Sequence, residues 1–253
     1  MMKRYTGIAL AAVLSVGLGA ASPASTAARW SDGEANDGRS LALTERDVAA
    51  SNEKAAMAYQ ALVHMWGENF RKVGERFAAP GLARYRGAVR TGCGIVGEGN
   101  AAYCARSNTI YFDEVFLAAQ AKRAALQLGT DGDMAAIGVV AHEMGHAAAI
   151  QLGHLSRTTY ENEAVADCLA GAFARRADAD GSLEPGDVDE AFYAMSTAGD
   201  PTPELTGDRR TDRRILDRLA SVSHGTREQR MGNFRAGLEG GPGACMEEMQ
   251  GVE

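Results

Sequence analysis

Two histidines and a glutamate in the middle of the chain have the types and spacing that a hydrolytic metal site requires. His142, Glu143 and His146 form a His-Glu-x-x-His pattern. On a helix, residues four apart lie on the same face, so both imidazoles can bind one metal ion. Glu143 lies about 100° further round the helix, within reach of a water bound to that ion. The spacing predicts a zinc site in which Glu143 is the general base.

The five-residue pattern alone is a moderate signal, because a helix can carry two unrelated histidines by chance. The surrounding residues weaken this alternative, since the helix is apolar on nearly every side. Its apolar residues are Ala135, Ala136, Ile137, Val139, Val140, Ala141, Ala147, Ala148 and Ile150. Such a helix is buried, and polar side chains within a core need a compensating partner.

A third ligand is available on the next expected helix. Glu163 and Asp167 are four residues apart and therefore share one face. Glu163 would complete a His₂Glu set for one zinc ion and leave a fourth position open for water. Asp167 could accept the ring N–H of a ligating histidine. Glu161 is a poorer candidate ligand, because it lies about 200° from Glu163 around the helix. Small residues such as Gly145 and Ala166 would let the two helices approach closely.

Further short motifs follow one another along the chain. They are Cys93-Gly94, Tyr103-Cys104, Ile110-Tyr111-Phe112-Asp113, His142–His146, Glu163–Gly171, Gly199-Asp200, and His224-Gly225-Thr226 followed by Gln229-Arg230. In this order the sequence resembles the bacterial putative neutral zinc metallopeptidases, a branch of the zincins with a glutamate as third ligand. The resemblance runs from about Gly92 to Cys245. It implies a zincin fold, metal ligands at His142, His146 and Glu163, and a general base at Glu143.

Two further expectations concern substrate. His224 is the best candidate for a hydrogen-bond donor to the developing oxyanion. The alternative, held equal, is a loop residue just ahead of a helix cap at Thr226. Zincins of this type hold substrate as an extra strand at a sheet edge beside the metal, and by position residues 108–112 are assigned to that edge. These residues also form the clearest strand candidate in the chain.

The elements that must position these residues are mostly helical. Thr44 followed by Asp47 predicts the start of a helix over residues 44–77. Asp113 is expected to cap a helix that ends at Gly129. The other expected helices are residues 134–152 opened by Asp131 or Asp133, residues 160–176, one with Pro185 in its first turn, and residues 227–238 behind a capping box of Thr226 and Gln229.

The arginine pairs 209–210 and 213–214 are offset by Asp208, Asp212 and Asp217, which is typical of a solvated helix face. Taken together, the elements predict an α+β fold, mostly helical, in which a zincin-like domain combines a small sheet with an active-site helix.

The four cysteines allow three pairings. Cys93 and Cys104 are close in sequence with glycines between them, which favours a local disulfide. That pairing leaves Cys168 with Cys245. A cysteine metal site is disfavoured because the chain has no Cys-x-x-Cys pair.

The N-terminus carries the pattern of an export signal. Lys3 and Arg4 precede an apolar run over residues 7–21, and small residues at 25–27 offer a cleavage site. The run is shorter than the ~20 residues of a membrane span. We therefore expect a signal peptide at residues 1–27, a flexible mature N-terminus at 28–43, and one domain over 44–253. This predicts a secreted, periplasmic or cell-envelope bacterial protein without a stable membrane span after cleavage.

The net charge of -7 argues against a nucleic-acid partner. The function that these features predict is that of a secreted zinc peptidase acting on peptides or proteins. A catalytically silent zinc-binding module at the cell surface is the first alternative, and a metal-free structural domain the second. Retention of Glu143 separates the peptidase from the silent module. The oligomeric state is not predicted.

Overall fold

The computed structural model describes residues 41–252. The predicted signal peptide and most of the predicted flexible segment lie outside the described residues. The described elements are α1 (Glu45–Lys72), β1 (Gly81–Tyr85), β2 (Val89–Thr91), β3 (Gly94–Val96), β4 (Ala101–Cys104), β5 (Thr109–Asp113), α2 (Glu114–Leu128), α3 (Asp133–Gln151), α4 (Thr159–Ala179), α5 (Asp187–Thr197), α6 (Arg209–Ala220) and α7 (Arg227–Gly240), followed by the 3₁₀ turns η1 (Pro242–Ala244) and η2 (Glu247–Met249).

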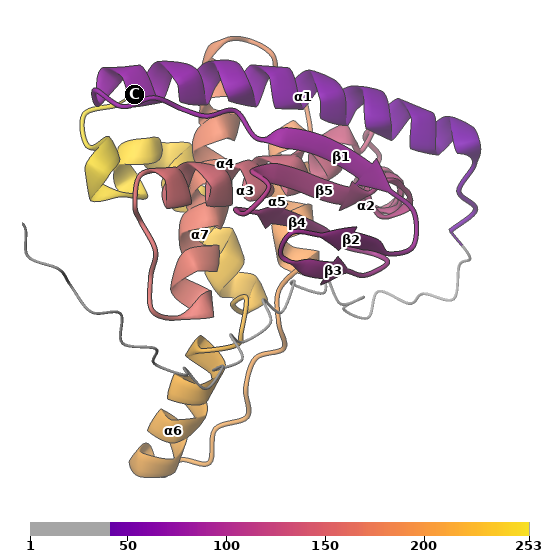
Figure 1. Cartoon of the computed structure of the whole chain (residues 1–253). Helices are drawn as coiled ribbons and strands as arrows, with labels where there is room; N and C mark the ends of the chain where they lie inside the picture. The colour runs from indigo at the N-terminus through magenta and orange to yellow at the C-terminus, as the bar shows by residue number, and fades with distance from the viewer. Residues whose placement is uncertain (1–40, 253) are drawn as a thin grey trace, which may run out of the picture.

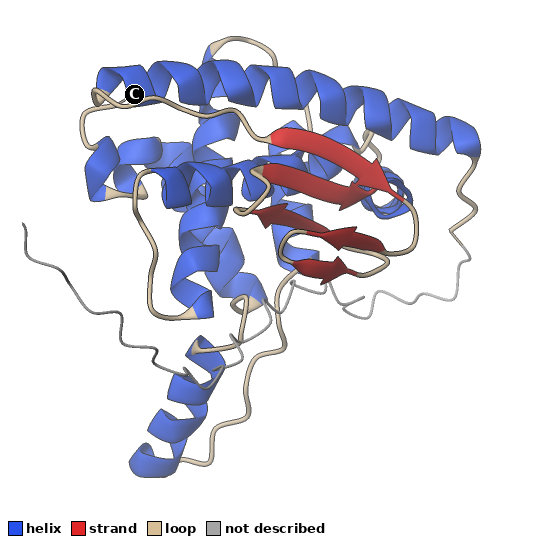
Figure 2. Ribbon diagram, viewed as in Figure 1, coloured by secondary structure: helices blue, strands red, loops and turns tan. Residues whose placement is uncertain are grey.

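The fold is α+β and mostly helical, as the sequence predicts (Figure 2). A three-stranded sheet has the order β1-β5-β4, with β1 parallel and β4 antiparallel to β5. Strands β2 and β3 form a separate antiparallel ribbon. The helix α1 runs along the top of the molecule beside this sheet (Figure 1).

The assignment of residues 108–112 to the sheet edge is wrong. This segment forms β5, which is the central strand and pairs on both sides. Its inward side chains Ile110 and Phe112 are buried in the main core, and its central place comes from β1 and β4 pairing on its two sides. The edge strand that contacts α3 is β4.

Local signals begin and end several helices as expected. The side chains of Thr44 and Asp47 form a capping box at the start of α1. Asp113 caps α2, which ends at Gly129 in the left-handed conformation. Thr226 and Gln229 form the capping box of α7. Helix α5, in contrast, begins at Asp187, so Pro185 precedes it rather than lying in its first turn.

The buried helix α3 is the centre of the domain and packs against α1, α2, α4 and α5. It starts at Asp133, but no side chain caps it locally. Instead Glu190 of α5 accepts the backbone N–H groups of Gly132 and Met134, at 2.9 and 2.8 Å. A carboxylate from another helix therefore satisfies the N-terminus of α3, because helix N-termini leave backbone donors without intrahelical partners.

Helix α4 lies unusually close to two neighbours. A Cβ built at Gly145 of α3 would lie 2.9 Å from the carbonyl oxygen of Ala166. At Gly237 of α7 it would lie only 1.7 Å from the carbonyl oxygen of Cys168. These close approaches pack α3 and α4, which carry the predicted ligands, directly against each other and pack α7 against α4.

Two disulfides join Cys93 to Cys104 and Cys168 to Cys245, as expected. The second ties the C-terminal segment to α4. Helix α6 projects from the body of the domain (Figure 1) and contributes no buried residue, which agrees with the predicted solvated face. No helix within residues 41–252 is long and apolar enough to cross a membrane.

Candidate metal centre

Helix α3 presents the two histidines and Glu143 from a buried position. His142 and Glu143 are almost fully buried, and His146 keeps 19% of its side chain exposed. The centre is therefore closed on the His142 side and open to solvent beside His146.

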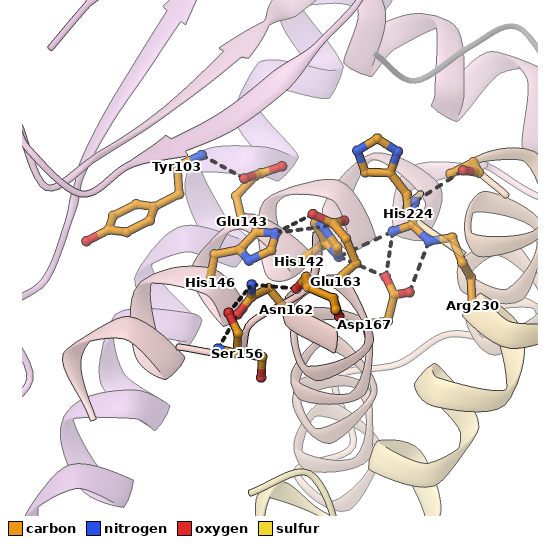
Figure 3. Close-up of polar contacts among 12 residues, drawn as sticks. Tyr103, His142, Glu143, His146, Ser156, Asn162, Glu163, Asp167, His224 and Arg230 are labelled. Atoms are coloured by element: carbon orange, nitrogen blue, oxygen red, sulfur yellow. Dashed lines mark hydrogen bonds and ion pairs between the residues drawn. The ribbon is translucent and has the colours of Figure 1, made fainter. Parts of the chain in front are cut away.

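Helix α4 brings Glu163 to the same point (Figure 3). Its Oε2 lies 3.2 Å from His142 Nε2, and its Oε1 lies 3.4 Å from His146 Nε2. The two histidine Nε2 atoms are 3.2 Å apart. Ligands that are each about 2.0–2.1 Å from a tetrahedral zinc ion lie roughly 3.3–3.4 Å from one another. The two imidazole nitrogens and the Glu163 carboxylate, which offers a different oxygen to each histidine, are thus close enough together to hold one zinc ion.

The hydrogen bonding of Glu163 supports the same interpretation. Its Oε2 is fully buried and accepts no hydrogen bond from any described residue; its nearby neighbour is the His142 nitrogen. Burial by itself favours the neutral acid, yet the adjacent His146 and His142 hold the pKa of Glu163 well below its usual range. A buried, ionised carboxylate oxygen without a hydrogen bond is rare in proteins and suits a cation.

Asp167 lies one turn further along α4 and contacts the other nitrogen of His142. Its Oδ1 is 2.8 Å from His142 Nδ1. An acceptor at this position places the ring proton on Nδ1 and leaves the Nε2 lone pair for a metal. The structure thus brings Asp167 to the place that the spacing on α4 predicts.

The sequence interpretation missed the role of Arg230, which is buried next to Asp167. Arg230 of α7 binds Asp167 with two N–H groups, Nη2 to Oδ1 at 2.5 Å and Nε to Oδ2 at 3.0 Å. It also donates through Nη1 to the carbonyl oxygen of Ala198 at 3.2 Å. Both side chains of the pair are at most 2% exposed. A bidentate arginine–carboxylate pair fixes the orientation of the carboxylate.

The charges in this buried group support one another. Burial would raise the pKa of Asp167, but the Arg230 charge and the contact with His142 keep it below its ordinary value. Burial would lower the pKa of His142 in the metal-free protein, and the carboxylates of Asp167 and Glu163 outweigh it and raise that pKa. The carboxylates on both sides of His142 therefore favour positive charge at this point, which a metal ion would supply.

Glu143 points toward the edge of the sheet. Its Oε2 accepts the backbone N–H of Tyr103 in β4 at 2.7 Å (Figure 3). This contact, which the sequence did not reveal, holds one carboxylate oxygen against the edge strand. It fixes the direction of a side chain that the helix alone would leave free to rotate.

His224 lies in the loop before α7, close to Arg230 in Figure 3. Its backbone N–H donates to Asp200 Oδ2 at 2.7 Å, and its Nδ1 lies 3.9 Å from the same oxygen. Burial opposes ionisation, but hydrogen bonds from His224 and Ser223 lower the pKa of Asp200 to about 2. Among residues 41–252 no contact joins the His224 side chain to the three candidate ligands, so its role as an oxyanion donor stays a prediction.

The sequence interpretation also missed the role of Asp200, which holds the loop at Ser223 and His224 through its Oδ2. Asp200 forms an isolated parallel bridge with Thr226, and its N–H donates to Gly225 at 2.8 Å. The motif residues Asp200 and Arg230 lie far from the metal pattern in sequence. The signal in the sequence that could have indicated Arg230 is Asp167, because a carboxylate buried beside a histidine needs a positively charged partner.

Comparisons with known proteins identify the family that the sequence resembles. The family model described as "Putative neutral zinc metallopeptidase" matches residues 1–248. The uncharacterized protein YpfJ of Escherichia coli K12 is 31% identical over 224 residues, which cover 79% of this chain and 74% of that protein. The uncharacterized protein Rv2575 of Mycobacterium tuberculosis H37Rv is 30% identical over 192 residues, covering 67% and 62% of the two chains. No solved structure matches the chain.

Proposed function

Because this chain belongs to the putative neutral zinc metallopeptidase family, we propose that it is a zinc-dependent peptidase that hydrolyses peptide bonds at the centre formed by α3 and α4. His142, His146 and Glu163 would hold one zinc ion. The observation that carries the proposal is the convergence of two histidine Nε2 atoms, 3.2 Å apart, with the carboxylate of Glu163. Its Oε2 lies 3.2 Å from His142 and its Oε1 lies 3.4 Å from His146, and the buried Oε2 accepts no hydrogen bond.

Zinc bound there would supply a Lewis acid that polarises the scissile carbonyl and makes a coordinated water more acidic. The residues of the chain have the other roles. Glu143 would take the proton of the attacking water and pass it to the leaving amine. The Tyr103 N–H holds one of its oxygens, at 2.7 Å, which leaves the other to move the proton.

Asp167 and Arg230 support this chemistry without touching substrate. Asp167 keeps the proton of His142 on Nδ1, and Arg230 keeps Asp167 ionised and correctly oriented. We also propose that His224 donates a hydrogen bond to the developing oxyanion, which would require its ring to turn toward the centre when substrate binds. Its partial exposure, 17% of the side chain, supports such freedom.

Secretion is part of the proposal. Two disulfides in a chain of this size are typical of an oxidising compartment, outside the bacterial cytosol. The predicted export signal at residues 1–27 points the same way.

Cleavage of a mixed peptide library, read by mass spectrometry, tests the proposal with Glu143→Gln as the matched variant. The variant keeps the size of the side chain and an oxygen for the Tyr103 N–H but removes the base. We expect the wild type to cleave and the variant to lose nearly all activity while retaining one zinc ion per chain. Zinc-loaded wild-type protein that cleaves no peptide would favour the silent zinc-binding module, and equal cleavage by both proteins would exclude Glu143 as the base.

A further inference from the structure

A cavity of about 250 Å³ opens directly beside the candidate metal centre. It lies between the end of α3, the loop that follows, and the start of α4. We call it the loop pocket. Two of its lining residues are candidate zinc ligands and four are apolar: His146, Glu163, Ala149, Ile150, Leu155 and Val165.

The size of the loop pocket suits one side chain. Sites for whole small molecules are typically ~300–1,000 Å³, so this cavity falls just below that range. Since His146 and Glu163 form part of its wall, whatever fills it lies next to the bond that the centre would hydrolyse.

The polar groups in the wall are already engaged. Asn162 donates through Nδ2 to the carbonyl oxygens of Ser156 and Thr158, at 3.2 and 2.8 Å, and accepts the Ser156 N–H at 2.9 Å. Figure 3 shows Asn162 and Ser156 next to the metal centre. Thr159 donates its hydroxyl to Ser221 at 2.8 Å. These bonds fix the shape of the loop and leave few groups that could bind a polar side chain.

The remaining polar residue in the wall, His154, lies with Nδ1 3.8 Å from Glu248 Oε2. Two of the four apolar residues, in contrast, are open to water: Leu155 is 73% exposed and Ile150 is 38% exposed. Covering apolar surface is favourable in proportion to the area removed from water. Two exposed aliphatic side chains at the mouth of one cavity, beside a catalytic centre, form a site that prefers an apolar occupant.

We infer that the loop pocket is a specificity subsite, which binds an apolar side chain of the peptide residue next to the scissile bond. This inference rests on the proposed function, because it assigns a substrate class to the same centre. Asn162 is a positioning residue for the subsite, and Leu155 contacts the substrate side chain.

The test uses dansylated heptapeptides of alanine and glycine in which one central residue is leucine, phenylalanine, alanine, aspartate or lysine. Binding is measured by fluorescence anisotropy on the zinc-loaded full chain with Glu143→Gln, and cleavage by mass spectrometry on the wild-type chain. Each is repeated with Leu155→Asp and with Leu126→Asp. Leu126 of α2 is 68% exposed and does not line the loop pocket, so it is a matched control.

We expect leucine and phenylalanine peptides to bind and to be cleaved roughly tenfold better than the aspartate or alanine peptides, the usual gain from a filled apolar pocket. Leu155→Asp should remove this preference, and Leu126→Asp should not. Since both leucines are exposed, neither variant should impair folding, and Ile150→Asp provides a second variant for the same wall.

The two proposals fail separately. Cleavage without an apolar preference, or a preference that survives both Leu155→Asp and Ile150→Asp, would overturn the subsite and leave the peptidase proposal intact. Selective binding that depends on Leu155, without cleavage by the wild type, would support the loop pocket as a site for an apolar side chain. It would overturn the peptidase, and the role of the pocket beside a scissile bond with it. If the protein shows no selective binding and no cleavage, both proposals are overturned.

Discussion

Replacing Arg230 with methionine removes the α7 charge that pairs with Asp167 while keeping a long side chain in the core. Both groups are at most 2% exposed, and two hydrogen bonds of 2.5 and 3.0 Å join them. Removing one partner of a buried ion pair leaves the other charge uncompensated, which costs about 3–5 kcal/mol. The total stability of a domain is about 5–15 kcal/mol, so we expect a folded but strongly weakened protein.

The same variant should weaken zinc binding. Asp167 Oδ1 lies 2.8 Å from His142 Nδ1 and accepts its N–H. Without Arg230 this carboxylate is free to turn or to take up a proton. Loss of such outer partners typically lowers metal affinity by about 10–100-fold. Stability and zinc affinity should therefore fall together.

Urea unfolding in the presence of a chelator gives the stability of the metal-free chain, and competition with a chromophoric chelator gives the zinc affinity. Arg235→Met is the matched control on the same helix. Arg235 is exposed and lies 5.2 Å from the Phe192 ring, a contact worth about 1 kcal/mol or less. The control should keep its zinc affinity.

A double variant separates the ion pair from general damage to the core. Asp167→Asn combined with Arg230→Met contains neither charge, so its loss of stability should be smaller than the sum of the two single losses. Additive losses, or an Arg230→Met variant within about 1 kcal/mol of Arg235→Met, would refute the claim that this pair supports the centre.

Three further predictions follow from contacts elsewhere. Asp200→Asn should lower stability at pH 7, because the folded-state pKa of Asp200 is about 2 against an ordinary value of 3.8. This contribution is present above pH 3.8 and is lost as the pH falls toward 2; the shift corresponds to roughly 2.4 kcal/mol, of which we expect about half because the group is partly open to solvent. Unfolding of both proteins at pH 7 and at pH 2.5 should show the difference shrinking, and a constant difference would contradict the assignment. Gly237→Ala should destabilise the domain by about 3 kcal/mol or more, because the new Cβ would lie 1.7 Å from the carbonyl oxygen of Cys168. The control Gly232→Ala on the same helix meets nothing within 4 Å and should stabilise the domain by up to about 1 kcal/mol. Equal melting temperatures of the two variants in thermal unfolding would refute the close approach of α4 and α7. Glu163→Gln should lower zinc affinity more than about 100-fold in a chelator competition, while Glu161→Gln, on the exposed face of the same helix, should not change it.

The residues at the centre could be predicted because their signal is local. The spacing of His142, Glu143 and His146 needs only helix geometry, and so does the relation of Glu163 to Asp167. The caps at Thr44, which bonds within its own turn, and at Gly129 were predicted for the same reason. Each of these features depends on residues within one or two turns.

The features that were missed depend on contacts between distant parts of the chain. Arg230 meets Asp167 across 63 residues, and Glu190 caps the start of α3 from 56–58 residues away. The position of β5 is a similar case, because β5 is central through pairing with β1 on one side and β4 on the other. An apolar strand pattern shows burial but does not show which neighbours provide it.

The central claim is that His142, His146 and Glu163 bind one zinc ion. Anomalous diffraction recorded on both sides of the zinc absorption edge, from crystals of the protein purified without added metal, tests it most directly. We expect one peak per chain, about 2.0–2.2 Å from each of the three ligand atoms. No zinc peak at this point, or a peak only at the other cluster of acidic residues, Asp131, Asp133, Asp187 and Glu190, would contradict the account.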